Sequence, residues 1–258
     1  MKLTNRLSKH VATLSVPILA VVLATALNAQ TQPGKAKVQA ISGSAVFSVA
    51  GGPAVPLKVG TVLDQGATVR TAKDSTVDLF LGRSAGMLRI VENTTLALEK
   101  LALIDTGADT VVDVQVSLPE GTMLFDVEKL SAASKYEIKV PNGVAGIRGT
   151  RGRINSAGFI VLREGRFVFV HVPPGGQPRP YTLVAPPTVY FTPVEGVKPA
   201  PPELVRELDN QFRGLSRGGE AAYPAPPTPS RPLAAPITPD QLPIDNTSEK
   251  EVSPTMAR

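Results

Sequence analysis

The sequence contains no cysteine and no tryptophan, and it has only two histidines, His10 and His171. Without cysteine the chain can form no disulfide, no cysteine-ligated zinc or iron–sulfur site and no cysteine nucleophile. Two histidines are also too few for a metal site built on several imidazole ligands. These absences predict a protein without a bound metal or cofactor, and they favour binding over catalysis.

Charge of one sign is not in large excess either. The chain has 27 Lys and Arg against 22 Asp and Glu, a formal net charge of +5, which for 258 residues does not by itself indicate nucleic-acid binding. Residues 146–153 form a compact basic stretch, but no aromatic residues are interleaved with its three arginines. We interpret this stretch as a turn that uses Gly146 and Gly149, and we expect no nucleic-acid partner.

The first 29 residues have the layout of an export signal. Lys2, Arg6 and Lys9 precede a run of 17 residues without a charge, from Val11 to Leu27, and small residues follow it. This order is typical of a secretory signal peptide, and the run is short for a membrane span. We expect residues 1–29 to be cleaved, the alternative being a retained N-terminal anchor. In both cases the chain works outside the cytoplasm, in the periplasm, in the cell envelope or as a secreted protein.

Short runs with a period of two residues fill the segment 35–195. Val77, Leu79 and Leu81 alternate with their neighbours, and the same period recurs over residues 112–118 and 136–140. Alternation of this kind predicts strands that have one buried face and one face in water. Turn residues separate the runs, so we expect an all-β domain of many short strands, arranged as a duplicated roll or as a twisted barrel-like domain.

A seven-residue pattern with a central glycine occurs three times, at residues 57–63, 118–124 and 162–168. A glycine that opens a strand indicates a turn with positive φ. The copies start 61 and 44 residues apart, whereas a solenoid keeps a fixed period. We therefore interpret them as parts of a duplicated roll, with chance similarity between short β segments as the alternative.

The composition changes after Gly196. Pro202 suits a first helical position, and a stripe of apolar residues follows it: Leu204, Leu208, Phe212 and Leu215. We expect residues 196–220 to be a linker with one short amphipathic helix that ends at Gly218-Gly219. The helix is expected to pack on the β domain, with docking to a partner as the alternative. Residues 221–258 are rich in proline and alanine and are expected to be a disordered tail.

Two short motifs could carry catalysis. The segment Gly82-Arg83-Ser84-Ala85-Gly86 fits the nucleophile elbow G-x-S-x-G, but that elbow needs a following helix, and here an apolar strand pattern continues. A hairpin turn explains its glycines better. The second motif, an apolar run into Asp105-Thr106-Gly107, resembles the active-site turn of retroviral-type aspartic proteases, in which two such aspartates share a proton across a dimer. That resemblance makes Asp105 the catalytic candidate in the alternative function; a plain turn is the other interpretation.

The longest resemblance covers residues 37–166 and has its clearest part at residues 136–150, an apolar strand, a Pro-Asn-Gly turn and a closing Gly-Thr. This segment resembles the signature end of FecR-type domains, and the upstream segments 71–75 and 92–96 follow the order of that family. The signature positions, to which we assign a structural role, are Tyr136, Pro141, Asn142, Gly143, Gly146, Ile147, Arg148, Gly149 and Thr150.

The resemblance implies a non-catalytic β domain. The family's namesakes are signal relays with a cytoplasmic anti-sigma segment, a membrane span and a periplasmic β domain that senses a TonB-dependent receptor. Only ten residues precede the hydrophobic run here, so we expect the extracytoplasmic half alone. The resulting expectation is a binding, scaffolding or signal-sensing module whose partners are envelope proteins. Strand addition at an exposed sheet edge would be one way for it to bind them.

The export signal generates the first prediction. Cleavage after Ala26 or after Ala29 would give a mature chain that begins at Leu27 or Gln30. We expect intact-mass measurement of the protein from an envelope fraction to give one of these two masses. A full-length mass in the membrane fraction would instead identify residues 1–29 as a retained anchor.

Overall fold

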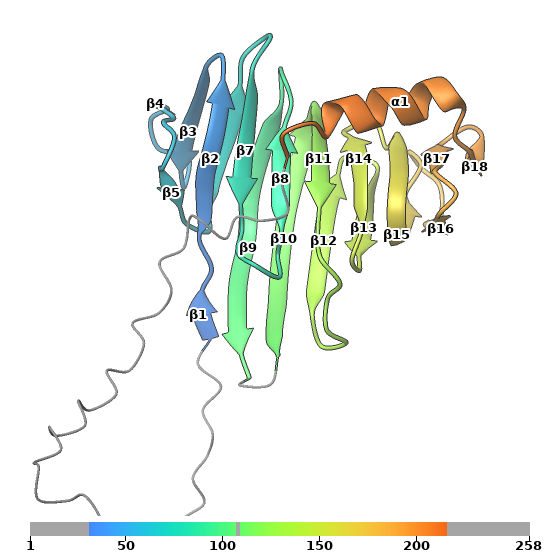
Figure 1. Cartoon of the computed structure of the whole chain (residues 1–258), viewed down its shortest axis with the longest axis horizontal. Helices are drawn as coiled ribbons and strands as arrows, with labels where there is room; N and C mark the ends of the chain where they lie inside the picture. The colour runs from blue at the N-terminus through green and yellow to red at the C-terminus, as the bar shows by residue number, and fades with distance from the viewer. Residues whose placement is uncertain (1–30, 107–108, 216–258) are drawn as a thin grey trace, which may run out of the picture. The chain divides into compact units, whose positions relative to one another are not determined.

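The computed structural model describes residues 31–106 and 109–215, which form strands β1 to β18 and the helix α1 (Figure 1). The all-β prediction is confirmed, and a short helix follows the last strand, as expected. The predicted signal peptide, residues 1–29, and the predicted tail, residues 221–258, lie outside the described residues.

The strands form two sheets that face each other. In order across sheet A the strands are β4 (Val55–Pro56), β3 (Ala45–Val49), β6 (Ala67–Thr71), β9 (Thr95–Asp105), β10 (Thr110–Glu120), β12 (Lys135–Val140), β13 (Gly143–Ile147), β15 (Ile160–His171) and β16 (Arg179–Ala185). A further short strand, β1 (Thr31–Pro33), pairs with the far half of β9. In order across sheet B the strands are β5 (Val62–Leu63), β2 (Ala36–Ser42), β7 (Thr76–Phe80), β8 (Met87–Ile90), β11 (Thr122–Asp126), β14 (Arg151–Asn155), β15, β17 (Val189–Thr192) and β18 (Gly196–Pro199).

β15 belongs to both sheets. Its first residues pair with β14 and β17 in sheet B, and from Gly165 onward it pairs with β13 and β16 in sheet A. At the opposite end no pairing joins β4 to β5 within the described part of the chain, so the sheets stay open there. Of the two arrangements expected from the sequence, the structure has the open, roll-like one and not a closed barrel.

The main core lies between the two sheets. Alternate residues of β10 point into it (Val112, Val114, Val116 and Leu118), as the period-two pattern predicts. Phe125 from sheet B stacks on Phe167 from β15, with ring centroids 5.5 Å apart. These two rings thus lie inside the layer, where they join the sheets.

The three copies of the glycine pattern mark corners where the chain passes between the sheets. Gly60 lies between β4 and β5, Gly121 lies between β10 and β11, and Gly165 lies at the crossing point within β15. Their φ angles are +85°, +93° and +90°. Residues other than glycine rarely adopt such angles. The glycine pattern therefore marks three places where the chain turns sharply from one sheet to the other.

The expectation that each strand has one wet face is wrong for β7. Asp78 and Phe80 were expected to face water, but both side chains are buried. The reason is α1 (Pro202–Gln211), which lies across the outer face of sheet B and packs on it through Leu208. An alternating pattern shows that a strand has two faces, but it does not show that another element covers the second one.

The helix begins at Pro202, as predicted, but ends at Gln211 and not at Gly218-Gly219. Gly214, with a φ of +74°, supplies the turn that ends the helix earlier. Phe212 and Leu215 of the predicted stripe therefore follow the helix, and they still pack on sheet B. The segment expected to be a linker is also partly strand, because residues 196–199 form β18.

The corner at Gly165 generates a stability prediction. A Cβ atom at this position would collide with the backbone oxygen of Gly149 and with Thr150, whereas one at Gly175, in the β15–β16 hairpin, would meet nothing within 4 Å. Both glycines have positive φ, so Gly175→Ala carries only the conformational cost of about 1–2 kcal/mol. We expect Gly165→Ala to cost at least about 3 kcal/mol of the free energy of unfolding. Urea unfolding of both variants tests this, and equal losses would contradict it.

Candidate functional site

The outer face of sheet B is occupied by α1. Arg89 on β8 forms a two-point ion pair with Asp78 on β7, with both N–O distances at 2.6 Å. Its remaining nitrogen, Nη1, donates to the backbone oxygens of Gln211 and Arg213, 2.7 and 3.0 Å away. The hydrogen bonds that Arg89 donates to the Asp78 carboxylate raise the pKa of the Arg89 guanidinium. Arg89 thus binds the carbonyl end of the helix, where the helix dipole favours a cation.

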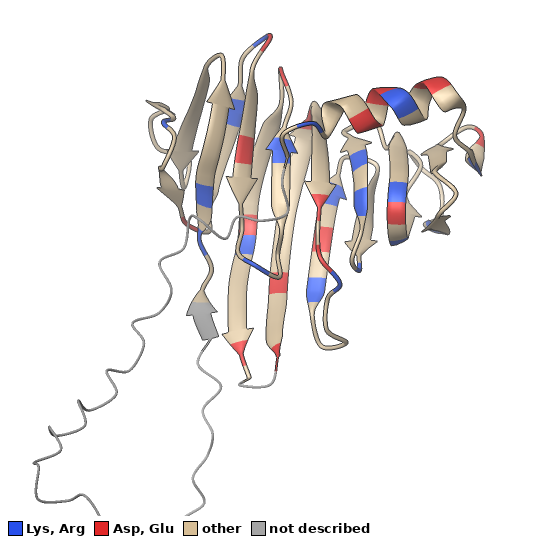
Figure 2. Cartoon of the chain, viewed as in Figure 1, with Lys and Arg blue, Asp and Glu red and all other residues tan. Residues whose placement is uncertain are grey.

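Three further arginines of sheet B contact α1 and the residues after it. Arg153 donates to Glu207 at 2.6 Å, and Arg163 donates to Asp209 at 2.9 Å. The guanidinium carbon of Arg151 lies 4.3 Å from the centre of the Phe212 ring. Figure 2 shows basic positions on β14 and β15 beneath α1, whose charged residues are three acidic ones and one arginine. The basic charge of this face is therefore used to hold the helix.

The outer face of sheet A carries no helix among the described residues. Its central strands present pairs of charged side chains in a ladder, with Lys100 bound to Asp113 at 2.5 Å and Lys139 bound to Glu99 at 2.7 Å. These side chains are partly exposed, and pairs of this kind contribute at most about 1 kcal/mol each. This part of sheet A is a solvated polar surface.

The end of sheet A that is formed by β13, β15 and β16 is different, because it exposes apolar side chains. The four outward valines, which we call the valine face, are Val144, Val168, Val170 and Val184. Three of them are exposed by 36%, 38% and 50%, in the order Val144, Val168 and Val184. They occupy neighbouring rows, since Val144 pairs with Val170 and Val184 pairs with Arg166. The opposite end of the sandwich, at β3 to β5, also exposes valines (Val49, Val55, Val59 and Val62). At the β13–β15–β16 end the apolar surface lies beside the longer edge strand β16 and the exposed Arg166 and Arg179.

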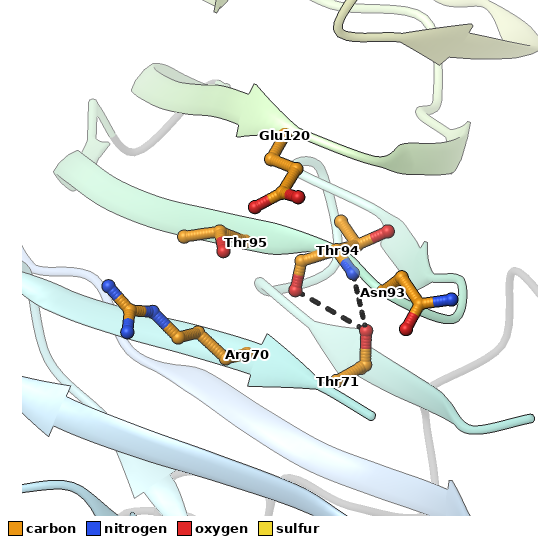
Figure 3. Close-up of a pocket in the computed structure, with 6 residues that line it drawn as sticks. All are labelled: Arg70, Thr71, Asn93, Thr94, Thr95 and Glu120. Atoms are coloured by element: carbon orange, nitrogen blue, oxygen red, sulfur yellow. Dashed lines mark hydrogen bonds between the residues drawn. The ribbon is translucent and has the colours of Figure 1, made fainter. Parts of the chain in front are cut away.

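A polar pocket of about 390 Å³ lies at the corner where the chain passes from β8 to β9. Figure 3 shows Arg70 and Glu120 on opposite sides of Thr95, with which both pair in register. The buried hydroxyl groups of Thr71 and Thr94 are occupied by internal hydrogen bonds. The Thr71 hydroxyl accepts from the backbone N–H of Thr94 at 3.0 Å, and the Thr94 hydroxyl accepts from that of Thr122 at 2.9 Å. The pocket thus lies at a seam, by which we mean the place where hydrogen bonds join the segments around Thr71, Thr94 and Thr122.

The structure brings together two segments that the family resemblance had singled out separately. Residues 71–75 and 92–96 meet at this seam, where the backbone N–H of Asp74 donates to Glu92 at 2.7 Å. Asp74 and Asn93 have φ angles of +53° and +51°. Aspartate and asparagine tolerate this conformation better than most residues, so both segments form turns at sheet corners.

The catalytic candidates from the sequence lie apart from one another. Asp105 is the last residue of β9 and is exposed at the tip of the β9–β10 hairpin. The segment Gly82–Gly86 is the turn of the β7–β8 hairpin, as the turn interpretation predicted. His171 is buried between the rings of Phe169 and Phe191 and donates from Nδ1 to the backbone oxygen of Asn142 at 3.0 Å.

The signature positions surround the β12–β13 hairpin and the corner that follows it. A Cβ atom on Gly143 would lie 2.5 Å from the backbone oxygen of Val170, and one on Gly149 would lie 2.7 Å from the Cα atom of Lys129. The side chain of Asn142 donates to the backbone oxygen of Ala157 at 2.8 Å. Arg148 donates to that of Ala132 at 2.7 Å. Ile147 and Thr150 are buried, Gly146 lies on the outer face, and Pro141 begins the hairpin turn.

Within the described residues, no group of three or more carboxylate or imidazole side chains is placed to hold a metal ion. No helix in that part of the chain has the length and apolar character that a membrane span requires.

Comparison with known protein families identifies residues 67–166 as matching the family described as FecR protein. The match begins with β6 and ends just after the Gly165 corner, and it is consistent with a FecR-family domain over these residues. The resemblance seen in the sequence extended upstream to residue 37, which this match does not cover. Nothing among the curated proteins or the solved structures matches the chain.

Sequence reasoning missed both the arginines that hold α1 and the valine face. One signal could have pointed to them: β7, β11 and β15 contain apolar residues on both faces, as in Phe167 to Val170. An unbroken apolar run predicts a strand whose second face is also covered. For β7 and β11 the cover is α1, whereas the outer face of β15 beyond Gly165 has no such cover in the described residues.

Tyr136 generates a pH prediction. Its side chain is buried, its hydroxyl has no hydrogen-bond partner among the described residues, and burial raises its pKa above the usual range. The folded state therefore keeps this proton above pH ~10, where an unfolded chain loses it, so rising pH costs stability at about 1.4 kcal/mol per pH unit. We expect Tyr136→Phe to be as stable as the parent at pH 7 and to lose less free energy of unfolding between pH 9 and pH 11. Parallel pH profiles of the two proteins would contradict this.

Proposed function

We propose that this chain is a non-catalytic binding module, of the signal-sensing or scaffolding kind, that acts outside the cytoplasm in the bacterial envelope. The FecR-family domain supports a role in sensing, because signal transduction is the setting of that family. The basic N-terminus and the uncharged run after it support export. The expected partners are envelope proteins.

The observation that carries the proposal is the unequal cover of the two outer faces. α1 buries Phe80, Met87 and Leu124 on sheet B, whereas sheet A leaves the valine face exposed. A contiguous exposed apolar surface in a soluble domain is typical of a site that another molecule covers. We therefore assign the partner to sheet A.

The positions of the polar side chains support binding over catalysis. Asp105 lies on an exposed hairpin, and the sequence contains one Asp-Thr-Gly motif, so an aspartic dyad would require two copies to meet at this tip. His171 is held by a backbone oxygen and by aromatic rings. Among the residues that the structure describes, a nucleophile, a base and an oxyanion site do not converge at either position.

We further propose that the signature residues act structurally. Gly143 and Gly149 allow backbones to approach each other, while Asn142 and Arg148 tie loops to the corner. In this interpretation the signature builds the surface that carries the partner site, and it does not itself contact the partner.

The absence of cysteine makes a precise test possible, because a single introduced cysteine is the only thiol in the chain. We place a photo-crosslinker on Val168→Cys in the valine face and, as the matched control, on Glu203→Cys at the exposed side of α1. Crosslinking in intact cells is expected to give a discrete envelope adduct from residue 168 and none from residue 203. Adducts of equal yield at both positions, or at neither, would contradict the assignment to sheet A.

A further inference from the structure

We infer that the free edge of β16, together with the valine face, binds an extended acidic segment of an envelope protein, which joins sheet A as an additional strand. This inference rests on the proposed binding function and specifies its surface and the chemistry of its partner. It is carried by the length of the edge, by the apolar surface beside it and by the basic side chains around it.

The other sheet edges are short. Within the described residues, β4 and β5 have two residues each, β1 has three and β18 has four. Short edges and edge prolines are the means by which proteins prevent unwanted strand pairing. β16 has seven residues, and β15 is the one described strand that pairs with it. Pro180, its second residue, has no backbone N–H, so the part of this edge with a full set of donors and acceptors is residues 181–185. Its other side is the longest edge that the sandwich leaves open to a further strand.

The register of β16 defines what an added strand would meet. Thr182 pairs with Val168, and Val184 pairs with Arg166, so these side chains point away from the core. Alternate residues of an antiparallel edge strand direct their backbone N–H and C=O groups away from the paired neighbour. An incoming segment would use these groups for main-chain hydrogen bonds, and its outward side chains would extend the rows of the valine face.

The charge around this edge is basic. Arg166 and Arg179 are exposed and have no polar or ionic partner within the described residues, while Arg148 contacts a backbone oxygen. The nearby acidic groups are engaged: Glu164 has a partner in the domain, and Glu137 binds Gln115 and Lys135. Complementarity therefore favours an acidic segment. A second copy of this chain would bring an identical set of arginines to the same edge, which disfavours self-pairing.

The experiment uses the mature chain and synthetic peptides of about nine residues, long enough to span the seven residues of β16. One peptide alternates valine and glutamate, a second alternates valine and lysine, and a third is the acidic peptide with alternate backbone nitrogens methylated. Fluorescence anisotropy gives each affinity. We expect the acidic peptide to bind more tightly than the basic one by about fivefold or more, which is the scale of one or two exposed charge pairs. Methylation is expected to abolish binding, because it removes main-chain donors.

Charge reversal locates the site. Arg166→Glu and Arg179→Glu together should invert the preference between the acidic and basic peptides. The matched control is Arg206→Glu on α1, another exposed arginine, which should leave both affinities unchanged. These substitutions are at solvated positions, and a melting curve of each variant confirms that it is folded.

Several outcomes would overturn the inference: equal affinity for both peptides, binding that survives methylation, an effect of Arg206→Glu equal to that of the Arg166/Arg179 double variant, or a dimer that pairs through β16 in solution. The proposed function fails separately. If residue 168 still crosslinks to an envelope protein while the peptides show no charge preference, the module binds on sheet A by another mechanism. If the peptides behave as expected but no adduct forms in cells, the binding function is contradicted.

Discussion

The fold depends on the corner that β15 makes at Gly165. This strand begins in sheet B and ends in sheet A, so the same backbone closes one end of the layer and fixes how the sheets face each other. Thr150 and the backbone of Gly149 approach Gly165 so closely that a side chain has no room there. Phe167, two residues later, then stacks on Phe125 of the opposite sheet. The turn and the core packing are thus one constraint, because a displaced corner would also separate these rings.

The two outer faces of the sandwich differ in what covers them. On sheet B, apolar residues and four arginines hold α1, and the ion pair of Arg89 with Asp78 links the sheet to the end of the helix. On sheet A, a polar ladder fills the centre, and the valine face lies beside a long edge strand. One face is therefore satisfied from within the chain, and the other offers apolar surface and main-chain groups to a partner.

Several features could be predicted from residues alone because their causes are local. The glycine pattern predicted turns with positive φ, because glycine is the residue that adopts such angles most readily. That these turns are corners between the two sheets came from the structure. Pro202 located the start of α1 for the same kind of reason. The end of the helix was predicted too late, because Gly214 competes with Gly218 and only the packing of Phe212 and Leu215 on sheet B shows which glycine ends it. Asp78 was assigned to water because its burial depends on a helix more than a hundred residues away in the chain.

By itself, the sequence determined the all-β class, the turn positions, the short helix and the resemblance to FecR-type domains, because alternation, glycines and prolines act over a few residues. Only the tertiary structure decided which strand faces are covered, that the segments around Thr71 and Thr94 form one seam, and that Val144, Val168 and Val184 lie on one surface. These outcomes depend on register and on contacts between distant segments. An alternating pattern indicates that a strand has two faces, but the rest of the chain determines what covers each face.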